Sequence, residues 1–224
     1  MGMDINSIGE WIAAASGLGL AAFAIVEGSK WTGIGLYGFP RIQGLLGPLF
    51  AMLKVAYGPE VVQLLKALYR QDRTGGDLER TLRQGVRVGL TAENAERAAK
   101  FVGVGEGAPL RQVAVKVRAG KELADDERNL LARFELAVDS RIEAALSLAD
   151  SHYSGKVRMT AAVISLTIAL AVAFTLDVQD RALDEEQLYG WATLLGLLGV
   201  PLAPIAKDVV NALQAAEKAL RRRA

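Results

Sequence analysis

The sequence contains MTAAVISLTIALAVAFTL at Met159–Leu176 and LYGWATLLGLLGVPLAPIA at Leu188–Ala206, and these two stretches decide its fold class. They hold 18 and 19 residues without a single Asp, Glu, Lys or Arg. A helix needs about 20 apolar residues to cross a bilayer, and a charge at its centre costs about 2.5–3.5 kcal/mol. We therefore expect a transmembrane helical hairpin. A pair of buried helices in a soluble protein is the less favoured alternative, because only eleven residues separate the runs.

Charged residues around the hairpin predict its orientation. The connector Asp177–Gln187 is acidic, whereas Lys156 and Arg158 precede the first stretch and basic residues follow the second. Positive residues favour the cytoplasmic side of a membrane. We expect both outer ends of the hairpin to be cytoplasmic. The aromatic residues expected to anchor it at the membrane–water interfaces are Tyr189 and Trp191 outside and Tyr153 inside.

A third apolar stretch, Trp11–Val26, holds 16 uncharged residues rich in Ala and Gly. Small residues allow close helix contact in lipid, so this stretch is predicted to be a third transmembrane helix. Lys30 and Arg41 follow it, which places the N-terminus outside. Three spans then predict a multi-pass protein of the cell inner membrane, with its C-terminus and its charged middle in the cytoplasm.

Residues 31–57 are apolar but interrupted by Arg41, Lys54 and several Gly and Pro residues. They fit a re-entrant segment, interfacial helices or a fourth span. Non-helical backbone at membrane depth must be covered by protein or water. The favoured interpretation is interfacial helices from which Arg41 and Lys54 extend to the lipid headgroups.

The charged middle of the chain, residues 59–157, is predicted to be a helical cytoplasmic domain. Its longest helix should begin near Asp125, because apolar residues follow at helical spacing. They are Leu130, Phe134, Val138, Ile142, Ala145 and Ala149. Only Gly155 interrupts the pattern before Met159, so one helix is expected to run from this domain into the membrane.

The predicted fold is therefore an all-α integral membrane protein with about three transmembrane helices and a helical cytoplasmic domain. Its expected divisions are residues 1–58, 59–157, 158–206 and 207–224. Pro201 and Pro204 each remove a helix hydrogen bond, so we expect a kink or a helix end there. The amphipathic tail 207–224 ends in Arg221, Arg222 and Arg223, which either bind anionic lipid or stop translocation.

The composition offers few groups for chemistry. There is no cysteine and a single histidine, His152, so thiolate sites and His-based metal or nucleophile sites are hard to assemble. No catalytic, metal or cofactor residues are predicted, and the net charge of +1 argues against nucleic-acid binding. The match of Gly33–Gly38 to G-x-G-x-x-G lacks the strand and helix that a dinucleotide site needs.

Two segments carry a family resemblance: RFELAVDSR at Arg133–Arg141 and LLGVPLAPIAKD at Leu197–Asp208. On the strength of these two segments, the last 95 or so residues, about 130–224, resemble a group of bacterial membrane proteins with no known activity. Those proteins have an N-terminal span, a helical cytoplasmic region and a C-terminal transmembrane hairpin. The resemblance implies the same arrangement here and implies no activity. The glycine-rich segment 31–57 departs from the usual pattern of the group.

The leading functional hypothesis is a non-enzymatic membrane scaffold or accessory subunit that anchors and oligomerises a complex. Its expected partners are the lipid bilayer and either further copies of the chain or another membrane-complex subunit. The alternative is a passive pore or transport component that uses broken helices at 31–57 and 201–204. No ionisable residue lies in the middle of a predicted span, which argues against active transport. A membrane-bound enzyme is a third, less favoured hypothesis.

Overall fold

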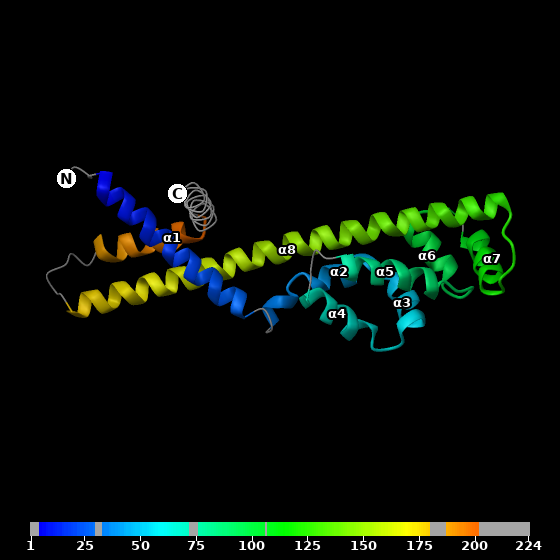
Figure 1. Cartoon of the computed structure of the whole chain (residues 1–224), viewed down its shortest axis with the longest axis horizontal. Helices are drawn as coiled ribbons and strands as arrows, with labels where there is room; N and C mark the ends of the chain where they lie inside the picture. The colour runs from blue at the N-terminus through cyan, green and yellow to red at the C-terminus, as the bar shows by residue number, and fades with distance from the viewer. Residues whose placement is uncertain (1–4, 30–32, 72–75, 106, 180–186, 202–224) are drawn as a thin grey trace, which may run out of the picture. The chain divides into compact units, whose positions relative to one another are not determined.

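The computed structural model describes residues 5–29, 33–71, 76–105, 107–179 and 187–201 (Figure 1). Every regular element within these ranges is a helix, which confirms the predicted all-α class. The chain divides into two compact units. The central unit is Gly35–Ser154, and the terminal unit combines Met1–Ile34 with Gly155–Ala224.

The boundaries of the central unit differ from the predicted ones. The sequence places its start at residue 59, whereas the unit begins at Gly35. Residues 35–57 belong to it because they form two short helices whose apolar side chains lie in its core. Phe39, Ile42, Leu49 and Met52 are each 1% exposed or less.

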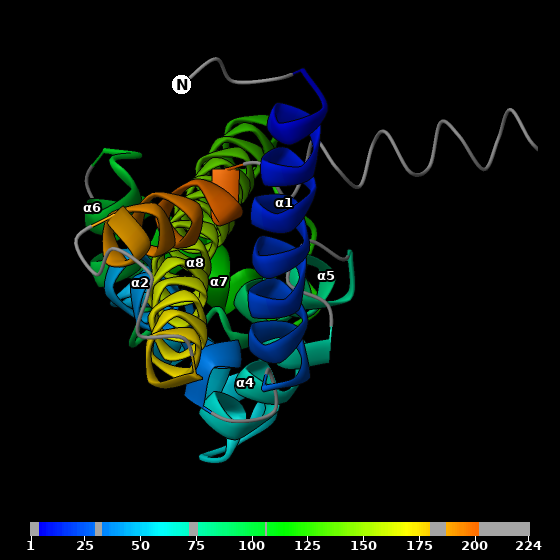
Figure 2. The same cartoon turned by 90° about the vertical axis from the view of Figure 1, so that its left-hand side faces the viewer.

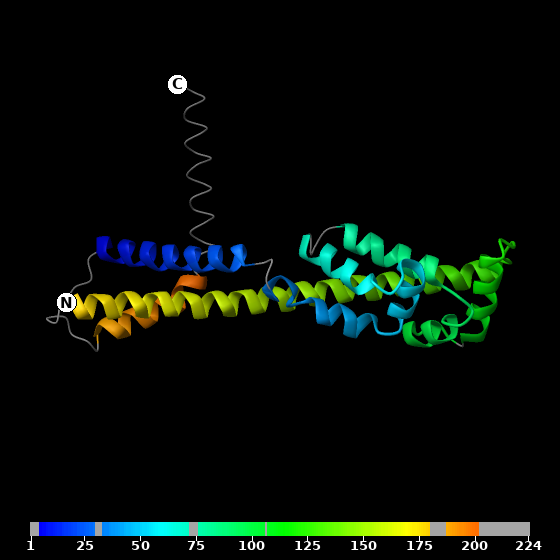
Figure 3. The same cartoon turned by 90° about the horizontal axis from the view of Figure 1, so that it is seen from below.

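Within the described ranges the central unit contains six short α-helices, gathered along the first part of the long helix α8 (Asp125–Gln179; Figures 1 and 3). The short helices are α2 (Phe39–Leu46), α3 (Leu49–Tyr57), α4 (Val61–Gln71), α5 (Gly76–Gly89), α6 (Ala95–Val102) and α7 (Gly107–Arg118). A short 3-10 helix, η1 (Gly33–Leu36), precedes α2. The core is continuous and contains large side chains, among them Phe39, Leu46, Met52, Leu65, Tyr69 and Phe134.

Glycine and proline explain why α2 and α3 are short. Pro40 lies in the first turn of α2, where its missing N–H is not needed. Gly47 ends α2 with a positive φ of 24°, and Pro48 caps the start of α3. The Gly and Pro residues that interrupt the apolar stretch 31–57 thus mark the ends of two short helices, α2 and α3.

Helix α5 packs closely against α3 through two of its glycines. A Cβ on Gly85 would lie 2.5 Å from the ring of Tyr57, and one on Gly89 would overlap the backbone of Met52. The hydroxyl of Tyr57 donates a hydrogen bond to the carbonyl of Thr81 at 2.9 Å. This contact fixes α5 in the position from which it meets α8.

Helix α8 has 55 residues and runs without a break from the central unit into the terminal unit. This confirms the predicted continuous helix. Five of the six residues of its expected inner face are buried, because Phe134, Val138, Ile142, Ala145 and Ala149 are each 2% exposed or less. The sixth, Leu130, is partly buried against the same core.

The terminal unit contains α1 (Ile5–Gly28), the later part of α8 and a helical segment at residues 187–201 (Figures 1 and 2). In the described residues, one helix is long and apolar enough to cross a membrane by length and composition, and its apolar part ends at Leu176. Only 22% of the most apolar 18 residues of this helix are buried. A shorter apolar helical stretch covers Ala13–Gly28.

Candidate functional site

Small side chains form the interior of the terminal unit. Among its described side chains, none that is buried is larger than valine. The buried residues are Ala15, Ser16, Gly19, Ala22, Val26, Val157, Ala161, Ser165, Ala169, Ala173, Ala192, Gly196, Gly199 and Val200. The central unit shows the opposite composition, with Phe, Tyr, Leu and Met inside.

Large apolar side chains cover the exterior of the terminal unit. Phe174 is 60% exposed, Leu197 52% and Trp191 41%. The others are Leu20, Ile25, Met159, Val163, Val172, Leu176, Leu194 and Leu198. Contact of such a surface with water costs about 25 cal/mol per Å² of apolar area. Extended apolar patches mark surfaces that other molecules or lipid cover.

The three helical segments of the terminal unit come together around Gly199. A Cβ on Gly199 would lie 2.8 Å from Ser165 Oγ and 2.9 Å from the carbonyl oxygen of Ala15. A Cβ on Gly196 would lie 2.7 Å from the Cα of Leu166. Glycines at these positions let helix backbones meet, which is the usual packing of helices in lipid.

Several hydroxyl groups of the terminal unit bond back to their own helices. Thr160 donates to the carbonyl of Lys156, Thr167 to Val163 and Thr193 to Tyr189, at 2.8–2.9 Å. These bonds satisfy polar groups that an apolar solvent would leave without partners. Ser165 differs, because its fully buried Oγ has no hydrogen-bond partner among the described residues.

The structure places the predicted lipid-contacting residues in different surroundings. Arg41 on α2 and Lys54 on α3 are exposed on the central unit. Trp191 is exposed and Tyr189 is partly buried. Tyr153 is 4% exposed, so little of its ring is available to headgroups.

Pro201 is exposed at the end of the described segment 187–201. Outside the described residues lie Pro204, Arg221, Arg222, Arg223 and most of the acidic connector. The predicted kink and the predicted lipid-binding tail therefore stay predictions.

A charged groove lies in the central unit between α5, α7 and α8. Its cavity measures about 140 Å³ and its apolar floor includes Val86, Leu90, Phe134 and Val138. Two pairs of opposite charge line its rim and join α5 to α8. Arg83 Nε lies 3.4 Å from Asp139 Oδ1, and the guanidinium of Arg87 lies 3.3 Å from Glu135 Oε2.

The sequence analysis does not find this groove. Arg83 and Arg87 are four residues apart on α5, and Glu135 and Asp139 are four apart on α8. Each pair marks one helix face, which is the signal that sequence offers. Nothing in the spacing shows that the two faces meet, because their contact depends on the packing of α5 against α8.

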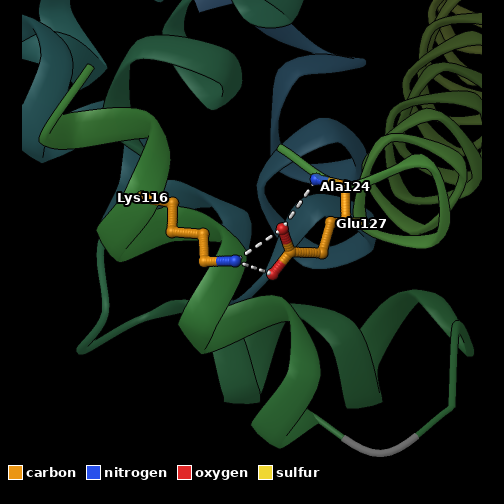
Figure 4. Close-up of polar contacts among 3 residues, drawn as sticks. All are labelled: Lys116, Ala124 and Glu127. Carbon is orange, nitrogen blue, oxygen red and sulfur yellow. Dashed lines mark hydrogen bonds and ion pairs between the residues drawn. The ribbon is translucent and has the colours of Figure 1, made fainter. Parts of the chain in front are cut away.

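A second polar contact fixes the start of α8 (Figure 4). The two carboxylate oxygens of Glu127 accept hydrogen bonds from Lys116 Nζ on α7, at 2.6 and 2.8 Å. The same carboxylate accepts the backbone N–H of Ala124 at 3.0 Å, as an acidic residue in a first helical turn commonly does. Both hydrogen bonds lower the pKa of Glu127, and the one from Lys116 has the larger effect.

The described residues place no three His, Asp or Glu side chains where they share a metal ion. The glycine-rich stretch 33–38 forms η1 and the approach to α2 rather than a strand followed by a helix. Gly38 instead lies against the Tyr69 hydroxyl and the backbone of Ala149, where a Cβ would overlap both. Its role is close packing inside the central unit.

The two surfaces with functional potential are thus the apolar exterior of the terminal unit and the charged groove of the central unit. Comparisons of the chain with protein-family models, curated protein sequences and solved structures found no match.

Proposed function

We propose that the chain is a membrane-anchored scaffold or accessory subunit. The observation that carries the proposal is the composition of the terminal unit, which has small residues inside and large apolar residues outside. Water would penalise this arrangement, because the largest apolar side chains leave about half of their surface exposed. Lipid imposes no such penalty and favours interiors in which small residues let helices approach.

In this proposal the terminal unit crosses the inner membrane three times. The spans are α1, the later part of α8 and the apolar run that begins at Leu188. Helix α1 has 24 residues, a length of about 36 Å at 1.5 Å per residue, and its uncharged run Trp11–Val26 accounts for about 24 Å of this. Spanning a hydrocarbon core of about 30 Å with this helix therefore places its charged ends near the headgroups. The distribution of basic residues supports an external N-terminus and a cytoplasmic C-terminus. The resemblance of roughly residues 130–224 to bacterial membrane proteins agrees with this arrangement.

The central unit is the cytoplasmic part of the scaffold. It has its own core of large side chains and a surface rich in paired charges. Its role in this proposal is to contact other proteins, including further copies of the chain, while the terminal unit holds it at the membrane. The chain carries no thiol and one imidazole, so its polar side chains are better suited to contacts than to nucleophilic chemistry.

Extraction and labelling test the membrane anchor directly. Membranes containing the full chain are washed with alkaline carbonate, and the protein is expected to remain in the pellet. Because the chain has no cysteine, single cysteines at Asn6, Lys54 and Asp184 report the topology through an impermeant maleimide. We expect labelling of intact cells at positions 6 and 184, and labelling at 54 only after permeabilisation. Recovery of the chain in the carbonate supernatant would refute the anchor.

The alternative of a passive pore has less support than the scaffold. Its sequence motivation included broken membrane helices at 31–57, but residues 35–57 pack into the core of the central unit. Its second motivation, the segment 201–204, lies almost entirely outside the described residues. Ion flux through liposomes that contain the purified chain, above that of empty liposomes, would favour the pore over the scaffold.

A further inference from the structure

The rim of the groove consists of two parallel rows of opposite charge. The basic row is Arg83 and Arg87 on α5, and the acidic row is Glu135 and Asp139 on α8. Arg83 faces Asp139 while Arg87 faces Glu135, so α5 and α8 run antiparallel here and the rows lie side by side. We call the surface formed by these four residues the charge-row face.

The charge-row face retains capacity for further polar contacts. The two pairs across the groove are separated by 3.3 and 3.4 Å, longer than the roughly 2.7–2.9 Å of a close charge-assisted hydrogen bond. The side chains of Arg87 and Arg83 are 55% and 38% exposed, and those of Glu135 and Asp139 are 34% and 26% exposed. An arginine has five N–H donors and a carboxylate about four acceptor positions. Arg83 already makes a second pair, with Glu79 at 2.6 Å. The donor and acceptor positions that remain on the four groups can take a further partner without releasing these pairs.

Apolar surface accompanies the charges. Val117 on α7 lines the same groove and is 46% exposed. A cavity with an apolar floor, a charged rim and an exposed aliphatic side chain in its wall has the composition of a protein-contact surface.

Two parallel rows of opposite charge are complementary to themselves. A two-fold axis parallel to the rows sets the basic row of one copy against the acidic row of the other. A two-fold axis across the rows, in the plane of the contact, sets like charges against each other. A self-complementary patch of this kind is what an isologous dimer requires. The favourable axis also makes α8 of one copy run in the same direction as α8 of the other, as in two copies inserted in one membrane with the same topology.

We infer that the charge-row face binds a second copy of this chain, so that Arg83 and Arg87 of each copy face Glu135 and Asp139 of its partner. The inference rests on the proposed scaffold function, for which it names the first partner and the surface used. Each close cross-pair of charges strengthens the contact, and like charges placed opposite one another disrupt it.

Charge reversal in the full chain, purified in mild detergent, tests the inference. One variant carries Arg83→Glu with Arg87→Glu, a second carries Glu135→Lys with Asp139→Lys, and a third carries all four changes. The native chain is expected to be dimeric by native mass spectrometry. Each double variant should dissociate at least ten times more readily, an equimolar mixture of the two should form a heterodimer, and the four-fold variant should again form a homodimer.

The mixture separates this inference from a purely internal role of the charges. Within one copy, either double variant places like charges across its own groove and loses stability whether or not a dimer exists. After the substitutions, both rows of the first double variant are acidic and both rows of the second are basic. Dimers can therefore recover on mixing only if the face of one variant contacts the face of the other. A monomeric native chain would overturn the inference, as would double variants that dimerise like the native chain or fail to combine.

Cross-linking provides a test that does not depend on the folding of the double variants. In the cysteine-free chain, Val117→Cys places a thiol in the groove, and Leu64→Cys places one at a 41% exposed position of α4. In native membranes, a short bis-maleimide is expected to join two copies through position 117 and not through position 64. No link at 117, or equal links at both positions, would contradict the inference.

The two proposals fail in different ways. Release of the chain by carbonate removes the scaffold proposal together with its membrane anchor. Retention in the membrane with no dimer through the charge-row face removes only this inference.

Discussion

The Oγ of Ser165 on α8 lies 2.8 Å from the point that a Cβ on Gly199 would occupy. At this point the later part of α8, segment 187–201 and α1 come together, because the same Cβ would lie 2.9 Å from the carbonyl oxygen of Ala15. The packing of the terminal unit thus requires a residue without a side chain at position 199.

Gly199→Ala is expected to destabilise the terminal unit by about 1–3 kcal/mol, the usual cost of overpacking a tight contact. Gly190→Ala is the matched control, since it lies in the same segment with nothing within 4 Å of its Cβ position. Thermal unfolding of both variants in detergent measures the difference. Equal midpoints for the two variants would show that the helices do not meet at Gly199.

Gly89→Ala should destabilise the central unit, because the added Cβ would overlap the backbone of Met52. Backbone cannot rotate away as a side chain does, so we expect a loss of at least about 1–3 kcal/mol. Gly44→Ala on α2 is the control. Its Cβ meets nothing within 4 Å, and replacement of an exposed helical glycine typically stabilises by up to about 1 kcal/mol. Chemical denaturation of the full chain compares the two variants.

Tyr57→Phe should remove the hydrogen bond to the carbonyl of Thr81 and keep the ring that packs on Gly85. Loss of one such bond costs about 0.5–1.5 kcal/mol. Burial raises the pKa of Tyr57, so its hydroxyl stays protonated and able to donate across the neutral range. The control is Tyr37→Phe, at a partly buried position. Denaturation midpoints should fall for Tyr57→Phe and stay within error for the control.

The contact between Glu127 and Lys116 predicts a loss of stability in acid. The pKa of Glu127 is lowered in the folded chain, first by the hydrogen bond from Lys116. The unfolded chain therefore binds a proton at higher pH than the folded chain does. The stabilisation is complete above the ordinary pKa of a glutamate and is lost as pH falls through the lowered value.

Glu127→Gln should abolish this part of the pH dependence, because the amide does not titrate. Glu122→Gln, at an exposed position before α8, is the control and should retain it. Thermal midpoints measured from neutral pH down to about pH 3 provide the comparison. The same acid sensitivity in Glu127→Gln as in the native chain would rule out this contact as its source.

Leu197→Asp tests whether the exterior of the terminal unit faces lipid. Leu197 is 52% exposed and lies near the middle of the apolar run, where an Asp costs about 2.5–3.5 kcal/mol if lipid surrounds it. Leu136→Asp, at a 69% exposed position of the central unit, is the control. The fraction of chain resistant to carbonate should fall for Leu197→Asp alone. Resistance unchanged in both variants would place position 197 in water.

The helical class, the apolar stretches and the inner face of α8 are readable from the amino-acid order alone. These features depend on local hydropathy and on a spacing of three or four residues, and a regular helix converts such spacing directly into a face. Phe134, Val138, Ile142, Ala145 and Ala149 were identifiable for this reason, and the structure buries all five.

The location of residues 35–57 follows from long-range packing, because their apolar side chains suit a membrane or a protein core equally well. Long-range packing also decides which helices meet. The pairing of Arg83 with Asp139 joins positions 56 residues apart in sequence, and the placement of small residues inside the terminal unit depends on three distant segments packing together. The local sequence pattern predicts that a helix has an apolar or charged face. Which other helix packs against that face depends on long-range contacts.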